Sequence, residues 1–227
     1  MAKLLTELIG TFFLVLTVGL TVIQGTPFAP LAIGTALMVM VYMGGHVSGG
    51  HYNPAVSLGV LLRRKMTAGE FGGYVGAQLV GAVLATLAVQ QIVGQTFAAA
   101  PASDVDFVAP LLVEVLFTFA LVLVVLNVAV SARTTGNSYY GLAIGFTVMV
   151  GAFAGGAISG GAFNPAVGLG PMLVHGLLSG GSFSAAWLYL VGPLLGGALA
   201  ALVFGLQEGD AVVVVEAGAA AGAPAGD

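Results

Sequence analysis

Two identical tripeptides are the residues of this chain whose types and spacing could do chemistry: Asn53-Pro54-Ala55 and Asn164-Pro165-Ala166. In each, the proline suits the first turn of a helix. The asparagine suits the position before it, where its side-chain oxygen accepts a backbone N–H. That bond would leave the amide NH2 pointing away from the helix. We therefore predict two helix starts that each present a neutral hydrogen-bond donor to whatever lies between them.

The ionisable residues suggest support rather than catalysis. Glu7 and Glu114 lie three and four residues inside apolar stretches, where an isolated charge is costly, so we expect each carboxylate to be paired or interfacial. His46 and His51 have no third ligand nearby in sequence, and we predict no metal and no cofactor. We expect His175 to be a solvated loop residue. No constellation supports an enzyme.

The elements that must position these residues are apolar helices. Apolar residues make up 59% of the 227 positions and charged residues only 6%, which places the chain in a lipid bilayer. None of the apolar stretches alternates as a membrane β-barrel strand does. They predict six spans, at about Leu4 to Gln24, Pro30 to Met43, Gly69 to Val93, Pro110 to Val130, Tyr139 to Ala154 and Ser184 to Leu206. Pairs of glycines four apart, as in Gly72-x3-Gly76, Gly141-x3-Gly145 and Gly192-x3-Gly196, predict close helix packing.

The chain contains an internal repeat. Residues 31–59 align without a gap to residues 142–170, with 17 identities in 29 positions. Each copy holds three spans and one short apolar stretch, Asn53 to Leu62 or Asn164 to Val174, which is long enough for only half a bilayer. Because three is odd, the second copy must be inverted relative to the first.

The inverted repeat brings the two asparagines together. The two half-spans enter from opposite sides, so their asparagine-bearing ends are expected to meet near the midplane. Helix ends there are tolerated only in protein or beside a wet cavity, which predicts a narrow aqueous path. Two facing helix N-termini, each equivalent to about half a positive charge, would repel cations and protons but not neutral solutes.

Together the two Asn-Pro-Ala boxes, the loops GGHVSGGHYNPAV and GGAISGGAFNPAV and the inverted repeat resemble the aquaporin (major intrinsic protein) family from Glu7 to Phe204. The resemblance implies an all-α membrane protein with six transmembrane helices and two re-entrant half-helices around one pore per subunit, assembled as a homotetramer. It implies that Asn53 and Asn164 donate to permeant molecules. It also implies that Glu7 and Glu114 support the re-entrant loops and that His51 is a partner of the second.

The resemblance also implies four outer-constriction positions, which counting from the asparagines places at Ile33, Ala152, Gly161 and Val167. A typical water channel has an aromatic residue, a histidine, a small residue and an arginine there, so this set lacks both charge and imidazole. We predict a wide apolar filter that passes water and small uncharged solutes. Urea, ammonia and hydrogen peroxide are expected before glycerol. Alternatively, Val167 only repeats Val56 of the first copy and says nothing about the solute.

Charge distribution gives the topology and excludes one class of partner. All five basic residues fall on one side of the predicted spans, which places both termini in the cytoplasm. A net charge of −4 offers no surface for nucleic acid. We expect an integral protein of the cell (inner) membrane. Its single channel domain covers residues 1–206, with repeats at about 1–93 and 110–206, and a disordered cytoplasmic tail covers 207–227.

Two other functions remain open from sequence. Secondary carriers also use inverted repeats and broken helices, and such a carrier would show saturable flux driven by an ion gradient. A structural membrane protein with a closed pore would pass no solute.

Overall fold

The computed structural model describes residues 1–208, and over that range all of the regular secondary structure is helical. Six of its helices are long and apolar enough to cross a membrane, and two are shorter, as the sequence predicts. The long helices are α1 (Ala2–Ile23), α2 (Ala29–Ser48), α4 (Ala68–Val93), α5 (Val108–Val125) with its π-helical continuation η1 (Leu126–Val130), α6 (Tyr140–Ser159) and α8 (Ala186–Glu208). The two shorter helices are α3 (Pro54–Leu62) and α7 (Pro165–Ser179), and a 3₁₀ turn, η2 (Ala132–Thr134), follows η1.

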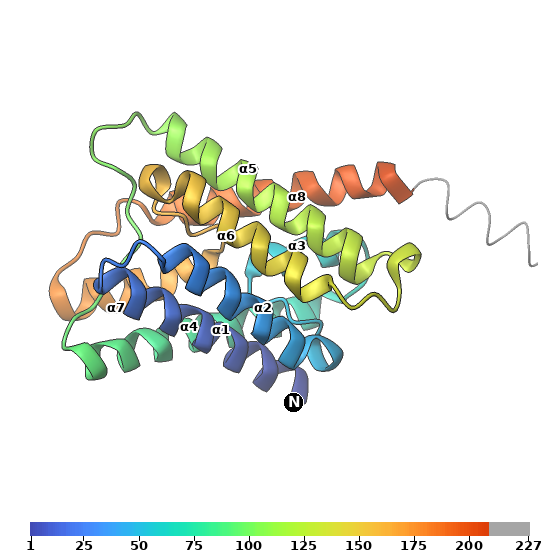
Figure 1. Ribbon diagram of the computed structural model, residues 1–227, viewed down its shortest axis with the longest axis horizontal. Helices are drawn as coiled ribbons and strands as arrows, with labels where there is room; N and C mark the ends of the chain where they lie inside the picture. Colours follow the sequence, from blue (N-terminus) through green and yellow to red (C-terminus); the bar gives the residue numbers. More distant parts are fainter. Residues whose placement is uncertain (209–227) are drawn as a thin grey trace, which may run out of the picture.

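Helix pairing follows the repeat. In the first half α1 packs on α4, and in the second half the corresponding helices α5 and α8 pack in the same way. The halves are joined where α2 packs on α6, and each short helix packs on a long helix of the other half, α3 on α8 and α7 on α4. Figure 1 shows α2 and α6 crossing the middle of the bundle, with the N-terminus and the end of α8 at the same end.

Two helices run farther than apolar periodicity predicts. The apolar stretches end at Met43 and Ala154, whereas α2 continues to Ser48 and α6 to Ser159. Both extensions contain paired glycines that count as helix breakers in isolation. Close neighbours explain why glycine is present: a Cβ at Gly44 would collide with the hydroxyl of Tyr52. The glycines therefore make room for packing and do not end the helices.

The glycine pairs divide into two groups. A Cβ at Gly145 would collide with the carbonyl of Gly34, so α2 and α6 touch backbone to backbone. Gly192 and Gly196 likewise lie against α5. Gly72 and Gly76 pack on no other helix of the described chain, because nothing in residues 1–208 lies within 4 Å of a Cβ at either position and both face outward.

The ends of the second half differ in detail from the sequence prediction. The helix α7 continues to Ser179, so His175 lies within it and is half-buried, not a solvated loop residue as predicted. Its imidazole Nδ1 lies 2.7 Å from Oγ1 of Thr96 in the connection between α4 and α5, and this contact holds it. The predicted tail begins at residue 207, but Gln207 and Glu208 complete α8, and residues 209–227 lie outside the described range.

Candidate functional site

The two short helices begin as their sequence predicts. Asn53 precedes α3 in an extended conformation, and its Oδ1 accepts the backbone N–H of Ala55 at 2.8 Å. Asn164 precedes α7 in the same way and accepts from Ala166 at 2.9 Å. Pro54 and Pro165 occupy the first helical positions, where no N–H is needed. Both asparagines are helix caps, and both amide NH2 groups point out of their helices.

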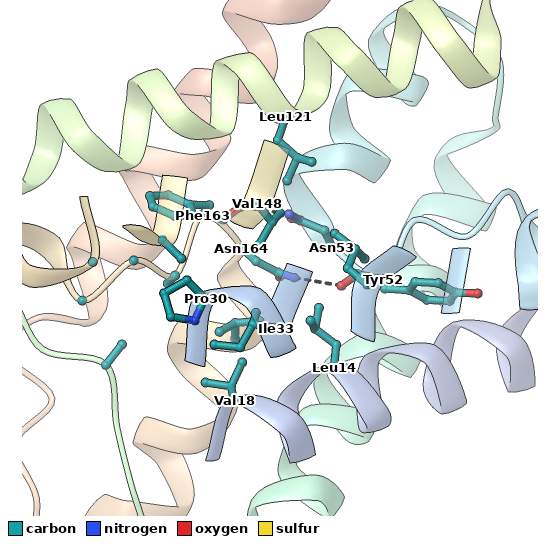
Figure 2. Close-up of a pocket in the computed structure, with 18 of the residues that line it drawn as sticks. Leu14, Val18, Pro30, Ile33, Tyr52, Asn53, Leu121, Val148, Phe163 and Asn164 are labelled. Carbon is teal, nitrogen blue, oxygen red and sulfur yellow. Dashed lines mark hydrogen bonds between the residues drawn. The ribbon is translucent and has the colours of Figure 1, made fainter. Parts of the chain in front are cut away.

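The two amide groups tie the two loops to each other. Nδ2 of Asn164 donates to the carbonyl of Tyr52 at 2.8 Å, and Nδ2 of Asn53 donates to the carbonyl of Phe163 at 2.9 Å. Figure 2 shows the first of these bonds, with both asparagines beside the same cavity. An amide NH2 carries two donors, so the cross-link uses one hydrogen and leaves the other for a further acceptor. Sequence reasoning brought the ends together but did not predict this reciprocal bond.

Tyr52 and Phe163 have a role that sequence reasoning missed. Each has a left-handed backbone, with φ of 48° and 50°, which for a residue with a side chain costs about 1–2 kcal/mol. Burial compensates: their exposed fractions are 0% and 1%. The Tyr52 hydroxyl also donates to the carbonyl of Met40 at 2.9 Å. The available signal was their shared position, since each directly precedes the asparagine of its copy.

Glu7 holds the first loop through both carboxylate oxygens. Oε1 accepts from the Ser48 hydroxyl at 2.7 Å and from the backbone N–H of His51 at 3.0 Å. Oε2 accepts from the backbone N–H of Tyr52 at 2.7 Å and from Nε2 of Gln78 at 2.8 Å. The residue is fully buried, so hydrogen bonds stand in for solvent around its carboxylate.

Glu114 repeats the arrangement in the second half. Its Oε1 accepts from the Ser159 hydroxyl at 2.8 Å and from the backbone N–H of Ala162 at 3.0 Å, and its Oε2 accepts from the N–H of Phe163 at 2.7 Å. No counterpart of Gln78 bonds to it within residues 1–208. Both glutamates thus bond to the backbone immediately before the asparagine caps, and neither lines the cavity.

Two tyrosines complete the supports. The hydroxyl of Tyr74 on α4 donates to the carbonyl of Ser48 at 2.7 Å, and that of Tyr189 on α8 donates to the carbonyl of Ser159 at 2.6 Å. Each bond fixes the last residue of α2 or α6, just before the loop turns. Their matching positions in the two halves of the sequence could have indicated that both tyrosines support the loops.

His51 lies in the first half of the structure. Its Nδ1 is 3.0 Å from the hydroxyl of Ser57, and its ring packs against the edge of Tyr74. No hydrogen bond joins it to Glu114 in residues 1–208, so the expected partnership with the second loop is not what the structure shows. The equivalent positions in the second copy are Ala162 and Gly168, which explains why this polar cluster exists once.

A cavity of about 420 Å³ runs past both asparagines. All four positions expected at the outer constriction line it. So do Leu14, Val18, Leu121 and Val148, which the sequence did not indicate and which Figure 2 labels. Its lining comes from α1, α2, α5, α6, both short helices and the connection between α4 and α5. The four expected constriction residues are Ile33, Ala152, Gly161 and Val167.

Among the described residues, this cavity has few polar side chains, and none of them is an acidic residue, a lysine or an arginine. Within residues 1–208 no Asp, Glu, Lys or Arg lines it, and the polar side chains are the two asparagines, His51 and the buried Tyr52. The loop carbonyls supply acceptors: those of Gly50, His51, Gly161 and Ala162 accept no hydrogen bond from the described residues. The cavity therefore combines apolar walls with two amide donors and with loop residues whose backbone carbonyls are unpaired within the described range.

Metal binding has no support from this geometry. No group of three His, Asp or Glu side chains that could hold a metal ion occurs in residues 1–208. His46 is exposed on α2, and His51 is engaged with Ser57.

Known proteins share this architecture. The chain is 36% identical over 215 residues to the glycerol uptake facilitator protein-like 6 of Lactiplantibacillus plantarum, an alignment covering 88% of this chain and 95% of that protein. It is 34% identical over 217 residues to aquaporin NIP1-1 of rice, Oryza sativa subsp. japonica, covering 90% and 73%. The solved aquaglyceroporin of Plasmodium falciparum shares the fold, with a TM-score of 0.80 and 22% identity over 89% of this chain and 94% of that one.

The family model described as major intrinsic protein matches residues 1–204, which include both asparagine caps and both supporting glutamates. With its repeat, its two re-entrant helices and its relatives all in agreement, the chain belongs to the major intrinsic protein family, whose members are channels and not enzymes.

Proposed function

We propose that the chain is a passive channel for water and small uncharged solutes that excludes protons and ions. The observation that carries this proposal is the reciprocal bond of Asn53 and Asn164 across an apolar cavity. Each bond orients one amide, and the hydrogen left free on it can donate to a permeant molecule. The loop carbonyls can accept from the same molecule, so a dipolar solute exchanges its hydration for protein contacts without meeting a charged group.

Ion exclusion rests on the same two helix ends. The N-termini of α3 and α7 both face the cavity centre, and each helix end is equivalent to about half a positive charge. No carboxylate lines the cavity within the described range to offset that potential. A cation or hydronium ion would lose its water shell and gain no anionic partner. A neutral molecule loses much less solvation free energy and is not repelled by the helix ends.

The solutes beyond water follow from the constriction. Ile33, Ala152, Gly161 and Val167 supply neither charge nor side-chain hydrogen bonds, so we propose a filter wider and more apolar than that of a typical water channel. Urea, ammonia and hydrogen peroxide fit such a filter. Glycerol ranks lower on these residues, which lack an aromatic corner. Two of the similar proteins are nevertheless named for glycerol, and glycerol belongs in the test.

Stopped-flow light scattering on proteoliposomes tests the assignment, with water, urea, ammonia and glycerol gradients. We expect Val167→Arg to reduce urea and glycerol flux much more than water flux, because a guanidinium fills the gap and adds a charge. Val167→Met is the matched control, of similar length but uncharged. Unchanged solute flux in the arginine variant would show that Val167 does not form the filter, and equal losses in both variants would assign the effect to size alone.

The same vesicles separate the other functions. Flux that saturates and needs an ion gradient would identify a secondary carrier, and the absence of any flux would identify a closed structural protein. Glu7 and Glu114, the only fully buried acidic residues among residues 1–208, both bond to the loops and do not line the cavity, which favours a channel.

We further propose that the chain forms a homotetramer in the cell membrane, with both termini in the cytoplasm and a single channel domain over residues 1–206. The end of the molecule that carries Arg63, Arg64 and Lys65 after α3 would be the cytoplasmic end. Accessibility of cysteines introduced at Lys65 and at Ser103 to an impermeant maleimide in intact cells tests the orientation. Labelling of the first and not the second would contradict it.

A further inference from the structure

A second cavity, of about 500 Å³, is lined by segments at the end of the bundle away from the N-terminus and the end of α8. It is bounded on one side by the connection between α4 and α5 and on the other by the C-terminal part of α7, the segment after α7 and the start of α8, and it is partly open. None of its lining residues belongs to the asparagine caps or to the four constriction positions. Its lining includes the alanines Ala98 to Ala100, the aromatic pair Phe107 and Trp187, and His175.

Only a thin wall separates this outer cavity from the lumen. Three consecutive alanines, Ala98 to Ala100, line both cavities. On the lumen side the wall touches the second re-entrant loop, since a Cβ at Gly160 would lie 2.8 Å from the carbonyl oxygen of Ala100. Pressure on the wall from the outer cavity therefore reaches the loop that carries Asn164.

The wall is held at both ends. The ring of Phe97 fills the space left by the missing side chain of Gly19 and lies against Val89. Beyond the wall, the backbone N–H of Ala102 donates to the carbonyl of Ile158 at 3.0 Å. These anchors fix the ends of a short segment whose middle carries only the methyl side chains of three alanines.

The outer cavity has the chemistry of a small-molecule site. Its volume falls within the range of ligand pockets, which are mostly apolar with a few placed polar groups. Phe107 and Trp187 meet edge to face at 6.5 Å between ring centres and offer an aromatic surface. No Asp, Glu, Lys or Arg lines it within residues 1–208, so a charged ligand has no partner there.

One imidazole nitrogen remains available to a ligand. Nδ1 of His175 contacts the Thr96 hydroxyl at 2.7 Å, and that hydroxyl contacts Ser179 at 2.7 Å. If Nδ1 carries the proton, the chain of donors runs from His175 to Thr96 to Ser179, and Nε2 is an acceptor. No residue of the described range forms a hydrogen bond with Nε2, although the backbone of Gly181 packs against the Cδ2 edge beside it. Ser182 and Ser184, bonded to each other at 3.0 Å, add hydroxyl groups.

We propose that the outer cavity binds a small neutral aromatic alcohol, with its ring against Phe107 and Trp187 and its hydroxyl donating to Nε2 of His175. Through the alanine wall the bound molecule presses on the second re-entrant loop and reduces flux through the lumen. The effect on flux rests on the proposed channel function, whereas the binding itself does not.

Trp187 makes the binding measurable, because it is the only tryptophan of the chain. In proteoliposomes, benzyl alcohol is expected to change Trp187 emission saturably and to reduce urea flux over the same concentration range. Ala102→Leu is the test variant: Ala102 lines the outer cavity only, and a leucine there fills it while the backbone bond to Ile158 remains. This variant should lose the saturable change in Trp187 emission, and benzyl alcohol should cause no further fall in its urea flux, whatever its basal flux. His175→Phe should weaken binding and keep the aromatic surface.

Three results would overturn the proposal. Emission that changes linearly with concentration, equally in wild type and Ala102→Leu, would mean that benzyl alcohol only partitions into the bilayer. Saturable binding with unchanged flux would show that the wall does not transmit the effect. Quenching of Trp187 by brominated phosphatidylcholine that falls in Ala102→Leu would identify the occupant as a lipid chain. A wild-type protein with no flux at all, yet with saturable binding, would contradict the channel and leave the site standing.

Discussion

At the scale of single residues, the two glutamates differ in how well they are satisfied. Glu7 accepts four hydrogen bonds and Glu114 three, because Gln78 has no counterpart in the second half. Their bonds to backbone N–H groups hold the loops in a conformation that includes two left-handed residues. A carboxylate is suited to this task, since it is acceptor-only and each oxygen can take two donors.

Replacing either buried glutamate by glutamine should destabilise the protein. Glu7→Gln and Glu114→Gln each turn one acceptor oxygen toward the loop into a donor, which leaves buried N–H groups unpaired at a cost of about 1–3 kcal/mol each. Thermal unfolding in detergent should show a clear fall in the midpoint for both. The control is Glu70→Gln on the exposed face of α4, where glutamine can still form the capping box with Thr67. Equal midpoints for all three variants would contradict the supporting role.

An aspartate in place of an asparagine cap separates capping from conduction. Asn164→Asp keeps the acceptor for the N–H of Ala166, but it loses the donor to the carbonyl of Tyr52 and adds negative charge at the cavity centre. We expect α7 to remain capped and the channel to leak sodium ions, measured as ion flux in proteoliposomes. Asn137→Asp, which removes amide donors outside the lumen, should not leak. A tight Asn164→Asp channel would contradict the proposed ion barrier.

At the scale of helices, backbone contact between α2 and α6 joins the two halves. Gly145→Ala would place a methyl group against the carbonyl of Gly34, so we expect a lower unfolding midpoint. Gly76→Ala is the matched control on α4, where nothing within 4 Å meets the new methyl group. It should leave the midpoint unchanged or raise it, since alanine in a helix gains about 0.5–1 kcal/mol over glycine. The opposite order of midpoints would contradict the crossing.

How far sequence predicts these helices depends on whether the cause is local. The starts of α3 and α7 were predictable because an asparagine cap and a following proline act within one turn. The ends of α2 and α6 could not be predicted in this way. At the end of α2, for example, Gly44 is needed because the Tyr52 hydroxyl occupies the space of a side chain, and the local sequence pattern does not reveal that contact. The outward-facing Gly72 and Gly76 make the same point in reverse: spacing suggests a contact, and only the three-dimensional arrangement shows whether a partner is there.

At the scale of the whole molecule, most of the predicted arrangement follows from the internal repeat of the sequence. An odd number of spans per copy inverts the second copy, and inversion alone brings Asn53 and Asn164 together. Duplication could not predict the features that occur in one half only. These are the contact between His51 and Ser57 in the first half and the alanine wall in the connection between α4 and α5. Such features depend on a single copy of the sequence and on which segments happen to meet.

Because the chain has no cysteine, the path of solutes can be mapped with mercurials on the wild-type background. We expect wild-type flux to resist a membrane-impermeant organomercurial, since no thiol is present. Ala152→Cys on α6 should make water and urea flux sensitive, because residue 152 lines the lumen and a bound mercurial would occlude it. Val150→Cys lies on the same helix with 55% of its surface exposed, and it does not line the lumen. Its thiol should therefore leave flux insensitive even where mass spectrometry shows that it is modified. Inhibition through residue 150 with none through residue 152 would place the permeation path outside the bundle and contradict the arrangement proposed for the whole molecule.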